Sequence, residues 1–230
     1  MTRAAVLGLA ALLATAGMAS AQTFTPAYRV RRVTFAAGTT TQSGYKIGDI
    51  TAELRRNAVG TTPPLPLFRA ESEIGRAAAA DIRLALALTR VVAIEIAGVF
   101  AQPQLNVRLS ADAEANEPAL AGERVSHYAV DVSGIVLLPD IGLGRRARGY
   151  AIGGGGYVRQ LHEGRLRIDT GRTIHAGGGV QYWFRGAVDR RQRPLGLRGE
   201  ARLVHRTGGI DYEGRSRTFP AVSALLFLGF

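Results

Sequence analysis

The sequence predicts an all-β fold, a closed antiparallel up-and-down β-barrel of eight strands that spans a membrane. Three observations predict it. Eight segments alternate between apolar and small or polar residues with a period of two, and charges of both signs occupy the middle of their polar faces. The last segment, 217–230, is apolar and ends on Phe230. A soluble chain rarely ends in this way, because termini usually meet water and are polar.

The first 21 residues have the features of a secretory signal peptide and are left out of the fold. Arg3 precedes a short apolar stretch, which closes on Ala19-Ser20-Ala21, the small-x-small pattern that signal peptidase accepts. We expect cleavage between Ala21 and Gln22, which leaves 22–230 as the barrel domain. The alternative is an uncleaved anchor, and the shortness of the apolar stretch argues against it. No later apolar run is long enough for a transmembrane helix.

The strand pattern begins weakly at 29–38 and then becomes regular. It is clearest over 81–89 and 91–100, which meet at the corner Thr89-Arg90 and therefore predict a tight hairpin. The other predicted strands are 126–138, 149–159, 173–184, 195–205 and 217–230.

Two long spacers interrupt this pattern, 39–72 and about 106–124. The first is too short to build a core of its own, so no second domain is expected. We expect a hairpin extension of the first loop there. The stretch YKIGDITAEL (45–54) leaves open an added strand pair, which would make ten strands. The second spacer is expected to be a loop.

Alternation alone does not say which face is the core. The apolar face packs inward in a soluble sandwich, whereas it meets lipid in a membrane barrel whose lumen takes the polar residues. Charges of both signs favour the barrel, because opposite charges satisfy one another in a narrow lumen. The predicted lumen charge network consists of Asp81, Arg83, Glu95, Asp131, Arg159, Arg198, Glu200 and Arg202.

Glycines and aromatic residues agree with a barrel. The glycine runs 153–156 and 177–179 would relieve crowding and permit tight bends in a closed sheet. A closed sheet also leaves no backbone edge unpaired in lipid. An interfacial girdle is predicted on the side of the 89–90 turn from the outward aromatics Tyr150, Tyr182, Phe184 and Phe230.

Composition excludes several kinds of site. The chain has no cysteine, so it has no disulfide framework and no thiolate metal site. Its net charge is +11 and almost all of its basic residues are arginine, but these are spread along the chain without a recognition motif. We therefore expect no nucleic-acid partner.

No motif predicts catalysis. Ser126 is adjacent to His127 and points to the opposite face, so the two do not form a Ser–His pair. The run 153–156 lacks the Lys-Ser/Thr and the helix of a phosphate loop. The remaining histidines, His162, His175 and His205, are expected in the lumen or at loop bases. We expect no enzyme activity, no cofactor and no metal.

These features resemble the small bacterial outer-membrane β-barrel proteins, the OmpA-barrel, OmpX and OmpW-like group. The resemblance rests on the leader, the eight segments and the terminal strand with Phe230. The stretches YAIGGGGYVRQLHEGR (150–165) and GLRGEARLVHRTGGIDY (196–212) look like outer-membrane β-barrel domain proteins of Gram-negative bacteria. The resemblance covers most of 29–230, and the weak first strand departs from it.

The resemblance implies a location and a set of partners. They are the bacterial outer membrane and its lipid, reached after export through the cleaved signal peptide, together with periplasmic chaperones and the barrel-assembly machinery. In such proteins that machinery reads the terminal strand, here Leu226, Leu228 and Phe230. The expected role is structural or in surface interaction, with a lumen filled by charges instead of a wide pore. Two alternatives stay open: a narrow OmpW-like channel for small molecules, and a secreted soluble β-barrel or sandwich that binds a ligand.

Overall fold

A computed structural model of the chain describes residues 33–54, 65–110, 119–138, 146–163, 167–185 and 193–230. These residues form β-strands and no α-helix, so the described part holds no helix long and apolar enough to cross a membrane. The predicted signal peptide, with its cleavage site at Ala21 and Gln22, lies outside these ranges.

Twelve strands follow one another along the described residues. They are β1 (Val33–Gln42), β2 (Tyr45–Leu54), β3 (Leu65–Ile74), β4 (Ala77–Ala87), β5 (Val92–Ala101), β6 (Gln104–Ser110), β7 (Ala119–Arg124), β8 (Ser126–Leu137), β9 (Ala147–Leu161), β10 (Ile168–Arg185), β11 (Leu195–Gly208) and β12 (Arg217–Gly229).

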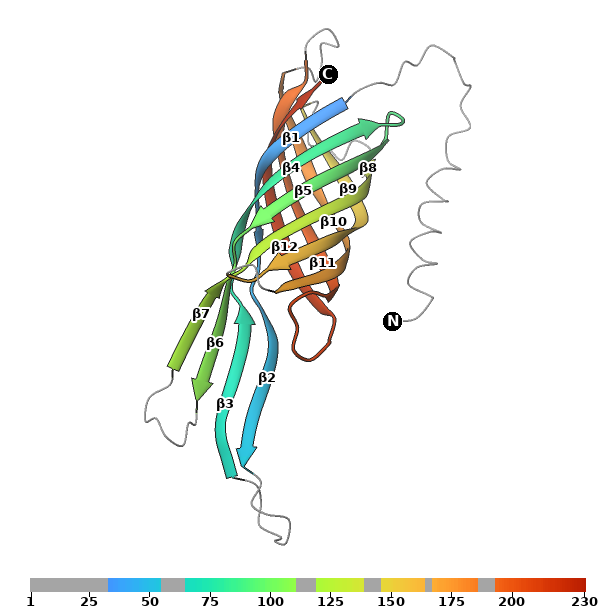
Figure 1. Cartoon of the computed structure of the whole chain (residues 1–230). Helices are drawn as coiled ribbons and strands as arrows, with labels where there is room; N and C mark the ends of the chain where they lie inside the picture. Colours follow the sequence, from blue (N-terminus) through green and yellow to red (C-terminus); the bar gives the residue numbers. More distant parts are fainter. Residues whose placement is uncertain (1–32, 55–64, 111–118, 139–145, 164–166, 186–192) are drawn as a thin grey trace, which may run out of the picture.

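Eight of the strands close into an antiparallel barrel in the order β1-β12-β11-β10-β9-β8-β5-β4 (Figure 1). Strand β1 closes it, because it pairs with β12 along one edge and with β4 along the other. The turn between β4 and β5 is tight, with the Leu88 N–H donating to the Val92 carbonyl oxygen at 2.9 Å. The predicted all-β, eight-stranded closed barrel is confirmed, and each of the eight predicted segments supplies one of its strands.

The other four strands form an open sheet, β2-β3-β6-β7, which we call the extension. Each continues a barrel strand past a short break and runs away from the barrel (Figure 1). The breaks are at Ser43-Gly44 (β1 to β2), Gly75-Arg76 (β3 to β4), Gln102-Pro103 (β5 to β6) and Val125 (β7 to β8). The extension stays open because the barrel neighbours of β1 and β8 do not continue beside it: β12 begins at Arg217 and β9 ends at Leu161.

The structure decides between the two interpretations of the first long spacer. It forms the hairpin β2–β3 in the extension, and the barrel keeps eight strands. The expectation of a loop over 106–124 is wrong, because this stretch holds most of β6 and the whole of β7. Residues of β6 pair with β3 on one side and β7 on the other, so long-range pairing supplies what the weak local alternation does not show.

A small apolar core joins the extension to the barrel. It contains Ile47, Ile74, Leu105, Val125 and Ile210, all at most 3% exposed. Ile210 belongs to the turn between β11 and β12, which therefore folds across this end of the barrel. The turn is anchored by the Ile210 N–H, which donates to the side-chain oxygen of Gln160 at 2.9 Å.

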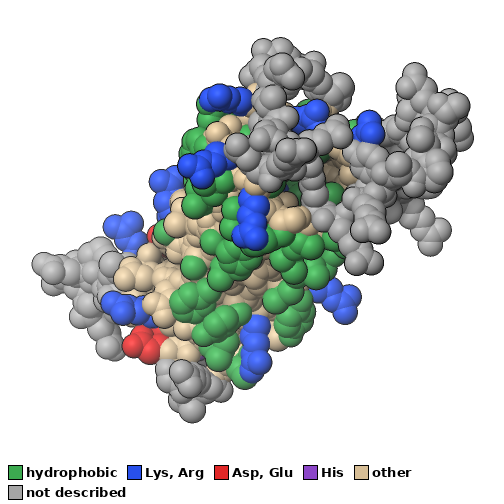
Figure 2. All heavy atoms as spheres, turned by 90° about the horizontal axis from the view of Figure 1, so that it is seen from above, with side chains coloured by type: hydrophobic (Ala, Val, Ile, Leu, Met, Phe, Trp, Pro, Cys, Tyr) green, Lys and Arg blue, Asp and Glu red, His purple; other side chains and the backbone are tan. Residues whose placement is uncertain are grey.

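Large apolar side chains cover the outer wall of the barrel. Ile82, Val130 and Ile174 are each more than half exposed, and Figure 2 shows such side chains gathered over the visible wall. Among the described residues, every exposed large hydrophobic side chain except Ile50 and Tyr212 lies on a barrel strand or directly beside one. Soluble monomers rarely expose an apolar surface of this extent, whereas a lipid-facing barrel wall requires it.

Aromatic side chains lie on the outer wall near both ends of the barrel. Phe100 and Tyr128 pack with ring centroids 5.0 Å apart near the extension. Tyr182 and Phe184 pack at 5.6 Å near the opposite end, where the predicted girdle places them. Tyr150 does not belong to this girdle, because its side chain is only 1% exposed and points into the lumen.

Strand β9 presents its side chains on the faces opposite to those predicted. Tyr150 and Val158 are buried, whereas Tyr157 and Arg159 are exposed. The prediction assigns the more apolar set to lipid, and the glycines at 153–156 offer no side chain that would contradict it. Arg159 is therefore on the outer face and outside the lumen, so its placement in the charge network is wrong.

A glycine on the neighbouring strand makes room for Tyr150 inside the barrel. A Cβ on Gly179 would lie 2.6 Å from Cζ of Tyr150, which is closer than real side chains approach. The glycine run of β10 thus admits a large ring to the lumen at a point where any side chain would exclude it.

Candidate functional site

The candidate site is the barrel lumen, where two facing strands supply most of the charged side chains. Side chains two residues apart on a strand share a face, so each strand directs its charges inward as a ladder. These side chains are at most 8% exposed: Asp81 and Arg83 on β4, Glu95 on β5, and Arg198, Glu200 and Arg202 on β11. Strands β1 and β12 lie between β4 and β11, so the two ladders meet only across the lumen.

Arg83 is bound by three carboxylates. Its Nη2 lies 2.6 Å from Oδ2 of Asp81, and its Nη1 lies 2.9 Å from Oε1 of Glu200 and 3.3 Å from Oε1 of Glu95. The guanidinium therefore joins three different strands through charge-assisted hydrogen bonds.

Two further arginines complete the cluster from the β11 side. Arg198 donates to Glu200 Oε2 at 2.5 Å and also pairs with Glu95. Arg202 pairs with Glu200 and lies 3.5 Å from Glu95. With Arg83 and Asp81, the cluster holds three arginines and three acids, so its formal charges cancel.

Hydroxyl groups that the sequence did not single out satisfy the edges of this cluster. Thr40 Oγ1 donates to Asp81 Oδ2 at 2.5 Å and lies 2.7 Å from Ser223 Oγ. Ser223 Oγ in turn accepts from Arg83 Nη2 at 3.0 Å. Thr40 and Ser223 are register partners on β1 and β12. Every second residue of these strands points into the lumen, and this alternation is the sequence signal that could have identified both residues.

Tyr150 links the cluster to β9. Its hydroxyl donates to Glu200 Oε2 at 2.6 Å and accepts from Arg198 Nε at 2.7 Å, and the Arg198 guanidinium lies over its ring at 4.6 Å. The reversed facing of β9 therefore adds a member to the charge network.

Asp131 lies in the lumen but belongs to a second, smaller group. It accepts a hydrogen bond from Thr173 Oγ1 at 3.0 Å, and its Oδ1 is 3.9 Å from Nδ1 of His175. His175 Nε2 contacts Ser133 Oγ at 2.9 Å and Arg202 Nη1 at 3.2 Å. Arg202 thereby connects this group to the main cluster.

The order Ser133, His175 and Asp131 superficially matches a nucleophile, a base and an orienting acid. Two contacts argue against that chemistry. Arg202 donates to the same His175 nitrogen that would have to take the proton from serine. Ser133 is also buried, and it is not among the residues that line the cavity between the charge cluster and the extension. The arrangement is that of a satisfied polar network.

Buried apolar side chains lie in the barrel on both sides of the charges. The core under the extension lies toward one end. At the other end lie two clusters, one of Ile135, Tyr150 and Ile152, and one of Ala36, Leu225 and Phe227 packed against Trp183. Buried apolar clusters therefore flank the charges toward both ends of the lumen.

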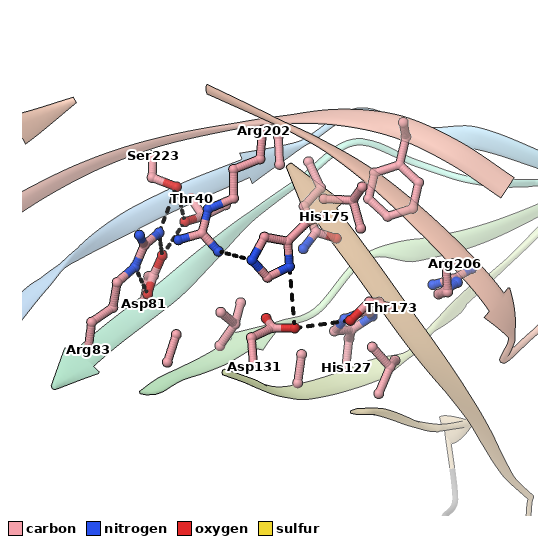
Figure 3. A pocket seen from close by; sticks show the side chains of 18 residues that line it. Thr40, Asp81, Arg83, His127, Asp131, Thr173, His175, Arg202, Arg206 and Ser223 are labelled. Carbon is pink, nitrogen blue, oxygen red and sulfur yellow. Dashed lines mark hydrogen bonds and ion pairs between the residues drawn. The ribbon is translucent and has the colours of Figure 1, made fainter. Parts of the chain in front are cut away.

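One cavity interrupts this packing, between the charge cluster and the extension. Its walls include Asp131, Thr173, His175, Arg202 and Arg206 (Figure 3). In Figure 3, Arg206 lies at the end of the cavity away from the dashed chain of Arg202, His175, Asp131 and Thr173.

The described residues contain no group of three or more His, Cys, Asp or Glu side chains arranged to hold a metal ion. His162, at the base of a loop, contacts Glu123 at 3.1 Å and Asp169 at 3.0 Å. These contacts join the extension to the barrel, because Glu123 lies on β7 and Asp169 on β10.

The terminal strand places its predicted residues on or near the outer wall. Leu226 and Phe230 are more than half exposed, and Leu228 is half-buried. The Phe230 N–H donates to the Val33 carbonyl oxygen at 2.8 Å, and Arg193 lies over the Phe230 ring at 5.5 Å.

Taken as a whole, the barrel has the reverse polarity of a soluble protein, with charges inside a closed sheet and apolar residues outside. The fold is that of a small outer-membrane β-barrel.

No protein-family model and no curated protein sequence matches the chain. Several solved structures are similar to it at low identity, among them three outer membrane proteins. The outer membrane protein OprG from Pseudomonas aeruginosa is 8% identical, with a TM-score of 0.43 over 88% of this chain and 95% of that one. The outer membrane protein AlkL, solved in DMPC bilayers, is 12% identical, with a TM-score of 0.36 over 92% and 96%. The outer membrane protease OmpT from Escherichia coli is 8% identical, with a TM-score of 0.29 over 92% and 100%.

Proposed function

We propose that this protein resides in the bacterial outer membrane as a non-conducting, non-enzymatic barrel with a structural or surface-interaction role. The observation that supports the proposal is the lumen, where a cluster of paired charges lies between buried apolar residues toward both ends. A wide pore would need continuous space along the axis, and buried ion pairs are costly to separate.

The extension supports a role in interaction at the surface. It stands beyond the apolar wall, its strands carry exposed charged residues such as Lys46, Asp49 and Arg108, and its two outer strands β2 and β7 have open edges. The tight β4–β5 turn lies at the other end of the barrel, with the start of β1 and the end of β12 (Figure 1). Short turns face the periplasm in outer-membrane barrels, so the extension is proposed to face outward.

Bilayer conductance tests the closed lumen. We expect the purified, refolded protein to give no stable single-channel current in planar bilayers. The double variant Arg83→Ala, Glu200→Ala removes two side chains from the centre of the cluster. Its single-channel current is compared with that of the unmodified protein. A reproducible current step from the unmodified protein would refute the closed lumen and favour a narrow channel for small molecules. The cavity above the charge cluster is the observation that favours this second candidate.

Cell fractionation tests the location. We expect the protein to stay with outer membranes after carbonate extraction, and the folded form to resist SDS until it is boiled. The exposed apolar wall supports this expectation. Recovery in the soluble periplasmic fraction would overturn it and favour a secreted binder.

We further propose that Leu226, Leu228 and Phe230 form the address read by the barrel-assembly machinery after delivery by periplasmic chaperones. The exposure of Leu226 and Phe230 on the last strand supports this role. Phe230→Ser should lower the amount of assembled, heat-modifiable barrel in cells. Leu203→Ser, an exposed position on neighbouring β11, is the control for loss of one apolar side chain. Equal assembly of the two variants would contradict a special role for Phe230.

A further inference from the structure

Arg206 on β11 is the buried cation that the lumen network leaves incompletely bound. Its side chain is 2% exposed. The guanidinium lies over the rings of Tyr45 at 4.6 Å and Phe219 at 5.8 Å, and Nη2 donates to the Tyr45 hydroxyl. Its Nε and Nη1 have no hydrogen-bond acceptor among the described residues. A buried cation with unsatisfied N–H groups is unfavourable unless an acceptor reaches it.

The acids of the lumen are engaged elsewhere. Glu200 and Glu95 bind Arg83, Arg198 and Arg202. Asp131 accepts from Thr173 and faces His175. Within the described part of the chain, no carboxylate forms an ion pair with Arg206.

Arg206 opens onto the cavity between the charge cluster and the extension, as Figure 3 shows. The cavity wall combines polar and apolar side chains. Thr173 and His127 bring a hydroxyl and an imidazole to it, and apolar surface comes from Ala129, Val158 and Val204 among others. A ligand at the Arg206 end would meet this cation and the apolar side chains. Charged side chains of the lumen network, Asp81, Arg83, Asp131 and Arg202, line the cavity as well.

We propose that this cavity binds a small organic monocarboxylate. Its carboxylate accepts hydrogen bonds from the Arg206 guanidinium, the type of charge-assisted bond that buried arginine makes most strongly. Its short apolar tail lies along Ala129, Val158 and Val204. Asp131, in the same wall, disfavours ligands of higher negative charge such as phosphate. The proposal is independent of the proposed function, because a closed barrel and a conducting one can both hold this site.

The test is the thermal unfolding of the refolded barrel in detergent, with sodium propionate as the probe at constant ionic strength. A ligand that binds only the folded state raises the unfolding midpoint saturably, here by about 3 °C. Sodium chloride and sodium phosphate form the two comparison arms. We expect neither to reproduce the shift. An equal shift with either salt would overturn the assignment to a carboxylate, and no shift with propionate would overturn the site.

Two variants locate the site. Arg206→Met should abolish the propionate shift, and Ala129→Leu should abolish it by filling the cavity while Arg206 stays in place. The second variant keeps the test decisive if the first one does not fold. Arg172→Met is the matched control, because Arg172 is exposed on β10 next to Thr173, the register partner of Arg206. A propionate shift that persists in Ala129→Leu, or that is lost in Arg172→Met, would overturn the proposal.

Discussion

Four stretches of chain each supply one strand to the barrel and one to the extension, but the two parts have opposite surfaces. Each stretch passes from one into the other across a short break at the junction. In the barrel, Leu84 and Ile96 are exposed outward, and Arg83 and Glu95 are buried inward. In the extension, charged side chains such as that of Glu73 are themselves exposed.

This difference shows how the surroundings select the polarity of a strand. A sheet that meets lipid on its outer face and encloses a narrow lumen places apolar side chains outward and pairs its charges inside. A single sheet in water has no reason to do so, and the extension buries apolar residues mainly where it joins the barrel. The junction therefore marks the edge of the apolar wall.

The largest expected effect comes from a charge inside the barrel. Glu200→Gln removes one of the two carboxylates, Glu200 and Glu95, that the three cluster arginines share, and breaking such buried pairs costs about 3–5 kcal/mol. Glu73→Gln makes the same change at an exposed position of the extension, where we expect less than about 0.5 kcal/mol. Urea unfolding in lipid vesicles measures the free energy of unfolding of both variants. Similar losses of unfolding free energy would mean that the lumen charges are not coupled.

The outer wall offers a closely matched pair of positions. Leu84 on the barrel and Ile50 on the extension are both 52% exposed. Leu84→Arg places a charge in lipid and should cost about 2–4 kcal/mol. Ile50→Arg places it in water and should cost less than about 0.5 kcal/mol. The same urea unfolding assay measures the free energy of unfolding of both variants. Equal losses of unfolding free energy at the two sites would contradict a lipid-facing barrel wall.

Two tyrosines of β9 test which way this strand faces. Tyr150→Phe removes a hydroxyl bound to Glu200 and Arg198, with an expected loss of about 2 kcal/mol. Tyr157→Phe changes an exposed ring, and we expect less than about 0.5 kcal/mol. If the larger loss came from Tyr157→Phe, the facing of β9 would be the reverse of that described.

The smallest expected effect is a pH dependence in the turn between β11 and β12. Burial acts to raise the pKa of Asp211, but hydrogen bonds from Arg217 and from the backbone N–H groups of Arg215 and Glu213 outweigh it and lower the pKa. A carboxyl with a lowered pKa stabilises the fold above its unfolded value of about 4, and this contribution is lost as pH falls through the folded pKa.

We expect this contribution to stay below about 1 kcal/mol, as for other ion pairs near the surface. Amide hydrogen exchange at Glu213 and Arg215, corrected for intrinsic rates, should show falling protection as the pH drops below about 4. Asp211→Asn should remove that dependence, whereas Asp49→Asn on the extension should leave it in place. An unchanged pH profile in Asp211→Asn would assign the effect to another group.

The sequence predicts the barrel well because its strands alternate for a physical reason that acts locally. Lipid outside and a narrow lumen inside impose opposite demands on successive residues, and β4, β5 and β11 carry both signals at once. The signal fails at β9, where glycines at 153–156 leave few side chains to define a face. It fails again at β6, which pairs with β3, and at β7, which pairs with β6, because this pairing does not depend on their own pattern.

The interior is only partly predictable, since its chemistry depends on which strands face each other. Arg83 and Glu200 stand out in the sequence as charged residues at inward positions. Thr40 and Ser223 look like ordinary small polar residues, because only the pairing of β1 with β12 brings them together. Arg206 is one arginine among many in the sequence. Its distinction comes from Tyr45, which lies far away along the chain, and from Phe219 on the neighbouring strand β12.

The seam between β1 and β12 also sets when folding can finish. It pairs Thr34 with Gly229, which are 229 − 34 = 195 residues apart. Until β12 is available, β1 and β11 each present an unpaired edge, and open edges are prone to wrong pairing. A chain cut short before β12 lacks the strand that pairs with both of these edges. Closure of this barrel therefore depends on the last strand of the chain to be made.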